Sequence, residues 1–248
     1  MKSLLIDAGN SAVKWALVED GAWLRQGVQE NAQVDRLHLS LADLPPPTRI
    51  VAANVAGEEM AKQLRTACSL WPCQIEFITA QAEQCGVRNL YQQPAQLGSD
   101  RWAALIAAWQ LEHSGCLVVN CGTATTLDTL SDQGEFLGGL ILPSTHMMRR
   151  SLATGAASLG TAMANGSWEQ FPRNTADALF SGAIQATVGA IHLQFDVLAG
   201  QGARRCLLSG GAADSVQPYL NIPVLRVENL VLRGLQIIGQ ETMRTGTV

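Results

Sequence analysis

The chain has 248 residues, 47% of them hydrophobic and 15% charged, which is enough apolar content for a buried core and too much for a disordered chain. The formal net charge of −4 argues against a nucleic-acid partner. The apolar run at the N-terminus is too short for a signal peptide, and no stretch approaches the roughly 18–20 apolar residues of a membrane span. The six cysteines show no zinc-ligand spacing and are typical of reduced, buried thiols. We therefore expect a cytoplasmic protein with no membrane or nucleic-acid partner.

Apolar runs separated by turn-forming residues predict alternating strands and helices. The predicted strands cover residues 3–7, 12–19, 22–28, 48–55, 74–79, 135–142, 205–211 and a stretch near 222–226, with a strand–turn–strand segment at 116–130. The predicted helices cover residues 57–71, a segment that begins near residue 99, 145–153, 174–199 and 229–241, with a short helix after residue 211. A loop rich in Gly, Ala and Ser follows residue 153. This alternation predicts the α/β class.

A shift of 113 positions superimposes the opening of the chain on its second half. The paired positions are Asp7 with Asn120, Gly9 with Gly122, Asn10 with Thr123, and Gly21 with Gly134. Each copy reads strand, glycine turn, strand, hairpin turn and strand, which indicates an internal repeat of long period. We therefore predict two similar halves, residues 1–114 and 115–248, with their two glycine turns facing each other across a cleft.

The first glycine turn lies in Asp7–Lys14 (DAGNSAVK), a segment suited to holding phosphate. A glycine between two strands lets backbone N–H groups approach phosphate oxygens, and Asn10 and Ser11 add side-chain donors. Asp7 can hold a phosphate-bound Mg²⁺ through water, because Mg²⁺ keeps several of its waters, and Lys14 adds a positive charge. The alternative is a plain Gly-Asn hairpin in which Asp7 accepts N–H bonds from the turn.

The second glycine turn, Gly122–Asp128 (GTATTLD), carries hydroxyls but no lysine. Small residues there leave room for phosphate; the alternative is a threonine-rich strand, since threonine favours strands. No G-x-x-x-x-G-K-[ST] sequence occurs in the chain, which excludes a P-loop kinase. Two further glycines, Gly210 and Gly211, would let a flat ring such as adenine lie against the backbone, or would form a tight strand-to-helix turn.

A third motif, Gly98-Ser99-Asp100-Arg101, opens a predicted apolar helix. Asp100 can accept the proton of an attacking hydroxyl, and phosphoryl transfer otherwise needs mainly positioning and charge neutralisation. Arg101 can grip a substrate carboxylate through two parallel hydrogen bonds. The alternative is that Ser99 or Asp100 serves as the N-cap of the helix.

Together these segments resemble the type III pantothenate kinases, also called the Bvg accessory factor family. Four motifs carry the resemblance in the family's order: D-x-G-N-[ST]-x-x-K at 7–14, G-x-D-R at 98–101, G-T-A-T-T-x-D at 122–128 and N-T-x-D-A at 174–178. The resemblance spans nearly the whole chain and implies the duplicated actin, Hsp70 and sugar-kinase fold (ribonuclease H-like), with two halves around a nucleotide cleft. It also implies that a homodimer phosphorylates pantothenate with ATP to 4′-phosphopantothenate, the first step of coenzyme A biosynthesis.

The resemblance assigns roles to individual positions. The residues that would contact ATP are Asp7, Ala8, Gly9, Asn10, Ser11, Ala12, Val13, Lys14 and Thr123. The residues that would line the pantothenate site are Tyr91, Gly98, Ser99, Asp100, Arg101 and, reaching across from the partner subunit, Thr175. Asp100 would be the proton acceptor. From local sequence alone, Tyr91 reads as a half-buried loop aromatic and Thr175 as a helix N-cap.

The chain departs from the family pattern at Asn120, where the family usually carries an Asp that binds a monovalent cation. The departure puts a K⁺ or NH₄⁺ site in question, but leaves the kinase assignment intact. Two alternatives remain: another small-molecule kinase of the same fold, or a non-enzymatic regulatory accessory protein. The second would need a DNA-binding element, and the sequence offers no basic recognition helix.

Overall fold

The computed structural model describes residues 1–155, 166–200 and 205–245, which pack as two units. The first unit comprises Met1–His113, Gly134–Phe136 and the segment from Asn229 onward, and the second comprises Ser114–Gln133 and Leu137–Glu228. Neither unit is continuous in the sequence, because the first includes both the closing helix and Gly134–Phe136, which interrupt the second. The division into residues 1–114 and 115–248, which follows chain order, stays a prediction. The predicted loop after residue 153 lies largely outside the described residues.

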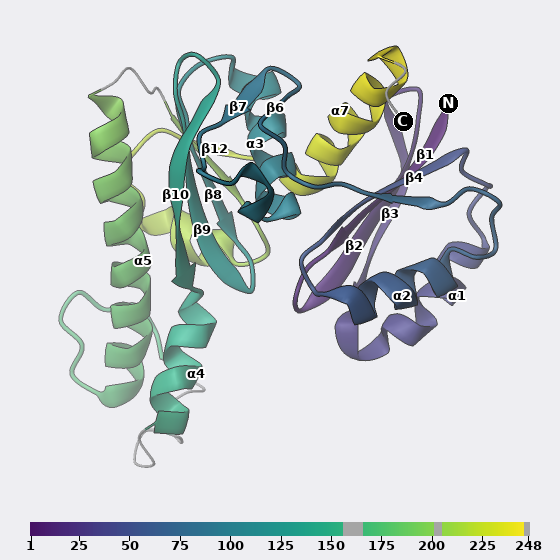
Figure 1. Cartoon of the computed structure of the whole chain (residues 1–248). Helices are drawn as coiled ribbons and strands as arrows, with labels where there is room; N and C mark the ends of the chain where they lie inside the picture. Colours follow the sequence, from purple (N-terminus) through teal and green to yellow (C-terminus); the bar gives the residue numbers. More distant parts are fainter. Residues whose placement is uncertain (156–165, 201–204, 246–248) are drawn as a thin grey trace. The chain divides into compact units, whose positions relative to one another are not determined.

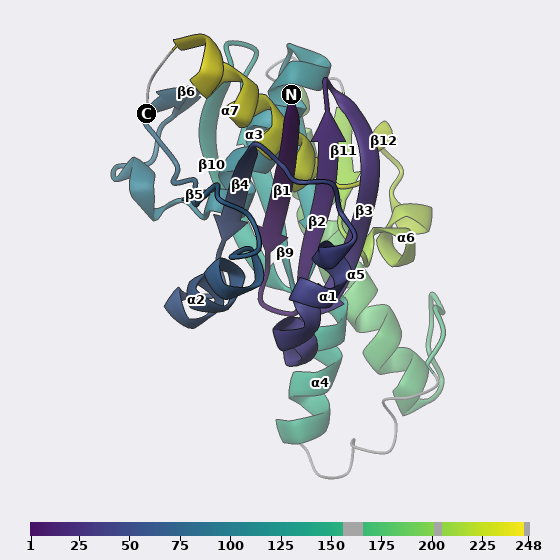
Figure 2. The same cartoon turned by 90° about the vertical axis from the view of Figure 1, so that its right-hand side faces the viewer.

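The first unit is built on a five-stranded sheet. Its strands are β1 (Lys2–Ala8), β2 (Ala12–Glu19), β3 (Ala22–Glu30), β4 (Arg49–Asn54) and β5 (Ile75–Phe77). They lie in the order β3-β2-β1-β4-β5 (Figure 2), with the first three antiparallel and β4 and β5 parallel to β1. Every predicted strand in this segment matches an observed strand to within two residues at each end.

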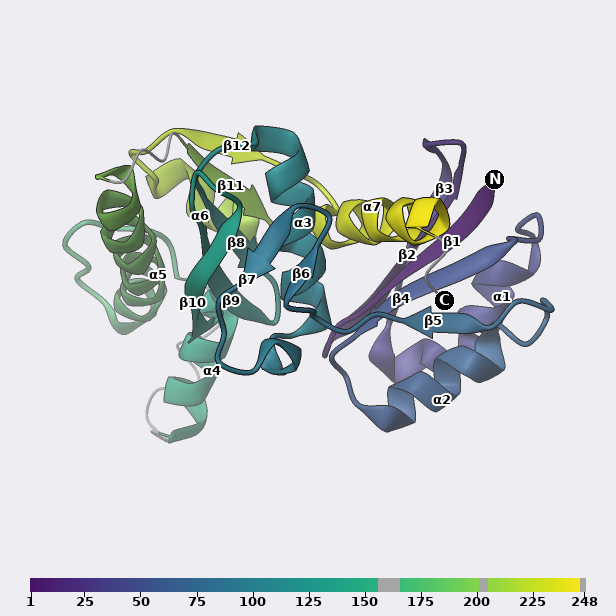
Figure 3. The same cartoon turned by 45° about the horizontal axis from the view of Figure 1, so that its top comes forward.

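Helices cover both faces of this sheet (Figure 3). The other elements of the first unit are η1 (Asn31–Arg36), α1 (Leu37–Ala42), α2 (Glu58–Ala67), β6 (Glu83–Gln84), β7 (Val87–Asn89), η2 (Pro94–Gln96), α3 (Ser99–Glu112) and α7 (Leu230–Thr245). Because strand side chains alternate between faces, Leu4 and Ile6 of β1 pack with Leu41 of α1 and Leu64 of α2 in one apolar cluster. The opposite face of the sheet carries α7.

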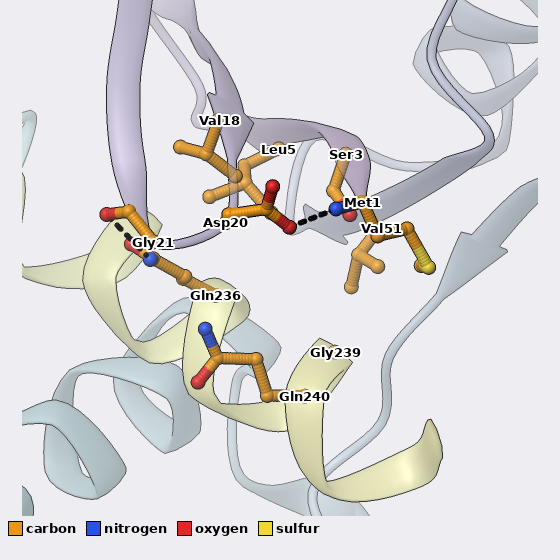
Figure 4. A pocket seen from close by; sticks show the side chains of 10 residues that line it. All are labelled: Met1, Ser3, Leu5, Val18, Asp20, Gly21, Val51, Gln236, Gly239 and Gln240. Atoms are coloured by element: carbon orange, nitrogen blue, oxygen red, sulfur yellow. Dashed lines mark hydrogen bonds and ion pairs between the residues drawn. The ribbon is translucent and has the colours of Figure 1, made fainter.

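The contact between α7 and the sheet is seen in Figure 4. Leu5 of β1 and Val51 of β4 line a cavity of about 120 Å³ together with Gly239 of α7. At its rim the N-terminal amine of Met1 is paired with the carboxylate of Asp20. A Cβ on Gly239 would lie 3.4 Å from the side chain of Val51, so α7 passes close to β4 at this point.

The second unit repeats this plan with a sheet of its own. Its strands are β8 (Cys116–Cys121), β9 (Ala124–Leu130), β10 (Glu135–Pro143), β11 (Arg205–Ser209) and β12 (Val224–Arg226), in the order β12-β11-β8-β9-β10. Its helices are α4 (Thr145–Gly155), α5 (Thr175–Ala199) and α6 (Ala213–Val216), followed by η4 (Gln217–Tyr219). Figure 1 shows α5 running beside the sheet, where Ile184 and Ile191 pack against Leu117 and Leu208. The first two residues of β10 belong to the first unit and pair with β7.

The strand pattern contains the internal repeat. The third strands of the two copies, β3 and β10, span residues 22–30 and 135–143, so both ends differ by the predicted 113 positions. The hairpin turns agree as well, since Gly21 and Gly134 have φ of 90° and 75°, in the left-handed region that favours glycine. Among the described residues, no helix is long and apolar enough to cross a membrane.

Helices α3 and α7 approach each other so closely that one position requires glycine. A Cβ on Gly234 of α7 would lie 1.8 Å from the carbonyl oxygen of Ala103 in α3. The two backbones are therefore in direct contact at this point. By contrast, Gly189 is exposed on α5, and a Cβ there would meet nothing within 4 Å.

We predict that Gly234→Ala lowers the melting temperature, because overpacking costs about 1–3 kcal/mol. For a chain of this size each kcal/mol shifts the Tm by roughly 2–4 °C. Differential scanning calorimetry of the variant measures the shift. A neutral Gly234→Ala would contradict the close approach of α3 and α7.

Candidate active site

The β1–β2 turn has open space around its glycine. The φ of Gly9 lies outside the left-handed region, and a Cβ there would meet its nearest atom, the carbonyl oxygen of Ala12, at 3.5 Å, an ordinary contact. The fold itself therefore does not require glycine at this position. Asn10 and Ser11 are exposed beside it. A backbone kept bare at an open turn fits the close approach of a ligand such as phosphate.

Two charged residues face each other across this hairpin. Asp7 and Lys14 occupy directly opposite positions of β1 and β2. The pKa of Asp7 is raised to about 7, mainly by burial and also by the nearby carboxylate of Asp100, while the charge of Lys14 lowers it. Burial also raises the pKa of Asp100, against the lowering effect of the N–H and charge of Arg101. Two carboxylates that disfavour each other's ionisation form a site where a cation would be stabilised.

Hydrogen bonds from the end of β4 connect the turn to the start of α3. The N–H of Val55 donates to the carbonyl oxygen of Ala8 at 3.1 Å. The N–H of Asn54 donates to the hydroxyl oxygen of Ser99 at 3.2 Å. Consecutive backbone groups thus hold the proposed phosphate turn and the G-x-D-R motif in one place. Ser99, predicted as a substrate contact, makes this structural bond in addition.

The α3 N-terminus gives Asp100 an unusual position. The N-cap is Gly98 and has no side-chain cap, so the alternative interpretation of Ser99 or Asp100 as N-cap is wrong. The carboxylate of Asp100 folds back and accepts the N–H of Arg101 at 2.8 Å. A Cβ on Gly98 would lie 2.6 Å from that carboxylate. Gly98 therefore provides the space in which the Asp100 carboxylate lies.

Arg101 lies against two aromatic rings that pack on each other, with their centres 5.1 Å apart. Only 7% of its surface is exposed, and its guanidinium lies 5.9 Å from the ring centre of Tyr91 and 5.8 Å from that of Phe136. Its Nη1 donates to the Tyr91 hydroxyl at 3.3 Å. The N–H of Tyr91 in turn donates to Asn89 at 3.1 Å, so the buried Asn89 fixes the loop that carries the tyrosine. This arrangement holds the guanidinium in one orientation, as recognition of a planar carboxylate requires.

The second glycine turn is one residue tighter than the first. Gly122 donates its N–H to the carbonyl oxygen of Ala124 at 3.0 Å, and Asn120 lies opposite Thr126. The residue opposite Asp7 in the first copy is Lys14, whereas the residue opposite its counterpart Asn120 in the second copy is Thr126. Thr123 is exposed at the turn, and a Cβ on Gly122 would again meet only an ordinary contact, at 3.6 Å.

Thr175 is the first residue of α5 and is exposed. Its local interpretation as an N-cap is wrong, because Asn174 caps the helix by accepting the N–H of Asp177 at 2.9 Å. The cap is held in turn by Asp177, which also accepts the N–H of Ser167 at 2.8 Å. The side chain of Thr175 is thus not used for capping.

The structure gathers the predicted site residues in two groups. The first unit brings together Asp7–Lys14, Tyr91 and Gly98–Arg101, and the second unit carries Asn120, Thr123 and Thr175. Within the described ranges, no three His, Cys, Asp or Glu side chains cluster as a metal site. No motif in the sequence marks Asn89, whose amide holds the loop backbone at Tyr91 and Pro94.

Comparison with known proteins places this chain. The sequence model of the family described as type III pantothenate kinase matches residues 3–196. This chain belongs to that family. A type III pantothenate kinase of Nitrosospira multiformis is 48% identical over 98% of this chain and 93% of its own length, and that of Aromatoleum aromaticum is 47% identical over 96% and 98%.

Solved structures show the duplicated actin, Hsp70 and sugar-kinase fold. The ethanolamine utilization protein EutJ of Carboxydothermus hydrogenoformans aligns with a TM-score of 0.56 at 11% identity, over 96% of this chain and 90% of its own. The activator of 2-hydroxyisocaproyl-CoA dehydratase from Clostridium difficile, solved with bound ADPNP, aligns with a TM-score of 0.51 at 10% identity, over 100% and 98%. The fold class predicted from the sequence is confirmed.

We predict that Asp7→Asn stabilises the nucleotide-free protein more at pH 8 than at pH 5. The pKa of Asp7 is about 7 in the folded chain and about 4 in an unfolded one, so the folded state holds the extra proton between these values. The stability that the neutral carboxyl contributes is present at pH 5 and lost as the pH rises through 7, whereas asparagine never ionises. The Tm of both proteins, measured with chelator present, should diverge over this range; parallel Tm curves would contradict the raised pKa.

Proposed function

We propose that this chain transfers the γ-phosphoryl group of ATP to the hydroxyl of pantothenate, giving 4′-phosphopantothenate in the first step of coenzyme A biosynthesis. The observation that carries the proposal is the Asp100 carboxylate in the space left by Gly98, next to Arg101 and its partner Tyr91, and connected through the end of β4 to the β1–β2 turn. It joins a proton acceptor, a carboxylate-binding cation and a phosphate-binding turn. A coupled assay with pantothenate, ATP and Mg²⁺ tests it directly.

Asp100 is the proposed proton acceptor. Its raised pKa brings the carboxyl closer to neutral pH, and a base is most effective when its pKa lies near the working pH. The bond from the N–H of Arg101 fixes one carboxylate oxygen, which leaves the other for the substrate hydroxyl. As the oxygen of pantothenate attacks the γ-phosphorus, the bond from that phosphorus to the β–γ bridging oxygen breaks, and the hydroxyl proton passes to Asp100.

Arg101 and Tyr91 are proposed to bind the carboxylate of pantothenate. The guanidinium is buried against the two rings and oriented by the tyrosine hydroxyl, so its hydrogen-bond donors are held in position for a planar anion. An Arg101→Ala variant with an unchanged KM for pantothenate would refute this role.

The residues Asp7 to Lys14, with Thr123, are proposed to bind ATP. Bare backbone at Gly9 and the exposed Asn10 suit the phosphates, and Lys14 adds a cation opposite Asp7. Mg²⁺ fits at Asp7 through water, since a cation would relieve the repulsion between Asp7 and Asp100. When bound, the ion would neutralise part of the phosphate charge.

The active form is proposed to be a homodimer in which Thr175 reaches the pantothenate site of the partner. Thr175 begins α5, and large apolar side chains are exposed on this helix and on the neighbouring elements of the same unit. They are Leu137, Leu140 and Ile141 of β10, Met147 and Leu152 of α4, and Leu193 and Val197 of α5. Exposed apolar residues in this number are typical of association surfaces. A monomer by light scattering at assay concentration would refute the dimer.

A cytoplasmic location is proposed from the thiols. All six cysteines are free, which is typical of proteins in a reducing compartment. Of the two alternative functions, the first is another small-molecule kinase. Assays of ATP-dependent phosphorylation with a panel of other hydroxyl-bearing acceptors would distinguish it from this proposal. A regulatory accessory protein would show no activity in the coupled assay.

We predict that Asp100→Asn lowers kcat by about 10²–10⁴-fold, because an amide cannot take the proton. Its KM for ATP should stay near that of the natural protein, and its Tm should not fall, since the amide keeps the size of the carboxylate and removes a charge that burial disfavours. Asp43→Asn, at an exposed position after α1, provides a matched control that should keep full activity. Steady-state kinetics decide: an Asp100→Asn variant with most of its kcat would remove Asp100 from the reaction.

We also predict that K⁺ or NH₄⁺ activates the enzyme weakly or only at high concentration. An amide at Asn120 offers one oxygen dipole to a monovalent cation where a carboxylate would add full charge, and at least tenfold weaker binding takes only about 1.4 kcal/mol. Activity should be titrated with KCl, NH₄Cl and NaCl at fixed ionic strength for the natural protein and for Asn120→Asp. Saturable activation of the natural protein by low-millimolar K⁺ would show that the amide suffices.

A further inference from the structure

Asn31 donates two hydrogen bonds to the β1–β2 turn. It directly follows β3 and begins η1. Its side-chain Nδ2 donates to the carbonyl oxygen of Gly9 at 2.9 Å, and its backbone N–H donates to the carbonyl oxygen of Ser11 at 3.0 Å. The two bonds hold both sides of Asn10, the exposed residue at the tip of the turn.

These bonds determine which backbone groups the turn presents. All described peptide bonds are trans, so the C=O of one residue and the N–H of the next point in opposite directions. The Gly9 carbonyl points toward Asn31, and the N–H of Asn10 therefore points away from it. Among the described residues Asn10 makes no hydrogen bond, which leaves this N–H available to a ligand.

Four of the five carbonyl oxygens from Ala8 to Ala12 accept a hydrogen bond from a protein donor, and within the described residues that of Asn10 does not. The acceptors and their donors are Ala8 with Val55 N–H, Gly9 with the Asn31 amide, Ser11 with Asn31 N–H, and Ala12 with Gly9 N–H. Carbonyl oxygens carry partial negative charge and would repel phosphate if they faced it. Asn31 engages two of these four oxygens.

The side-chain amide of Asn31 donates to the turn, while its own oxygen is left without a hydrogen-bond donor among the described residues. Its Oδ1 is buried, and no donor in the described part of the chain reaches it. A flipped amide would bring two acceptor oxygens together at Gly9, so the donor must face the turn. A buried acceptor left without a partner is unfavourable, and such groups persist where they serve a purpose other than stability.

The second copy of the repeat uses the equivalent position differently. A shift of 113 takes Asn31 to Ser144, which follows β10 as Asn31 follows β3. Ser144 caps α4, because its Oγ accepts the N–H of Met147 at 3.2 Å. The turn contact through an amide is therefore a feature of the first copy, the one that also carries Lys14.

We propose that Asn31 is a positioning residue for nucleotide phosphates: it holds the carbonyls of Gly9 and Ser11 toward the protein and so presents the N–H of Asn10 to phosphate. The inference rests on the proposed function, because it takes the bound anion to be the phosphates of ATP. Asn31 itself touches neither substrate. Its loss should weaken binding of nucleotides with a phosphate chain, and should leave the affinity for adenosine and the KM for pantothenate unchanged.

The test compares Asn31→Asp and Asn31→Ala with Gln29→Glu. Asn31→Asp keeps the shape and replaces the donor with an oxygen that repels the Gly9 carbonyl, while Asn31→Ala removes the donor without adding charge. Gln29→Glu adds the same charge two residues earlier on β3, where the natural side chain contacts Gln33 and not the turn. Calorimetric titration with ADPNP and with adenosine measures affinity, and initial rates give each KM.

In both Asn31 variants the affinity for ADPNP should fall at least about tenfold, which corresponds to about 1.4 kcal/mol of binding free energy. The KM for ATP should rise by the same factor. Adenosine affinity and the KM for pantothenate should stay within about twofold, and Gln29→Glu should match the natural protein. ADPNP affinity unchanged in Asn31→Ala, or ADPNP and adenosine weakened alike, would overturn the inference while leaving the kinase assignment standing. If the natural protein bound ADPNP but did not phosphorylate pantothenate, the proposed function would fail and the titrations would still decide the role of Asn31.

Discussion

The site depends on two consecutive hydrogen bonds at the end of β4. Val55 holds the carbonyl of Ala8 and Asn54 holds the hydroxyl of Ser99, so one short stretch of backbone fixes both the turn and the start of α3. Without them, the carboxylates of Asp7 and Asp100 would have little reason to stay close, since each disfavours the ionisation of the other. A hydrogen-bonded frame thus holds together charges that repel. The catalytic proposal needs this frame, because phosphoryl transfer depends mainly on positioning.

Much of the fold could be predicted from periodicity and turn residues. The meander of β1, β2 and β3 follows directly from alternating apolar residues and the Asp20-Gly21 turn, and β10 repeats β3 at the same offset. The short elements η1, α1, β6 and β7 were not predicted, because segments of two to six residues carry too little periodic signal. The predicted helix 57–71 ends at Ala67, since apolar residues beyond it pack as a loop against the same cluster.

The candidate site shows where local sequence reasoning stops. The motifs led to Asp100 and Arg101, but the alternative that Ser99 or Asp100 caps α3 failed because Gly98 takes that place. Asn31 and Asn89 could not be found from sequence, because each acts by holding a backbone group of a residue that is distant or lies in a loop. Such contacts form only when the strands have paired in their native register and the loops have folded. Supporting amides of this kind carry no motif, whereas residues that touch a substrate do.

The alkylation rates of the buried cysteines can report local opening of each of the two units. Burial raises the pKa of Cys68 to about 12 and that of Cys121 to about 11, so neither thiol is a competent nucleophile while its surroundings stay folded. Cys68 belongs to the core of the first unit and Cys121 to that of the second, while Cys73 is half-buried. The alkylation rate of each buried thiol therefore reports how often its own unit opens. A nucleotide that stabilises one unit would slow the thiols of that unit alone, and a nucleotide that closes both would slow all of them together.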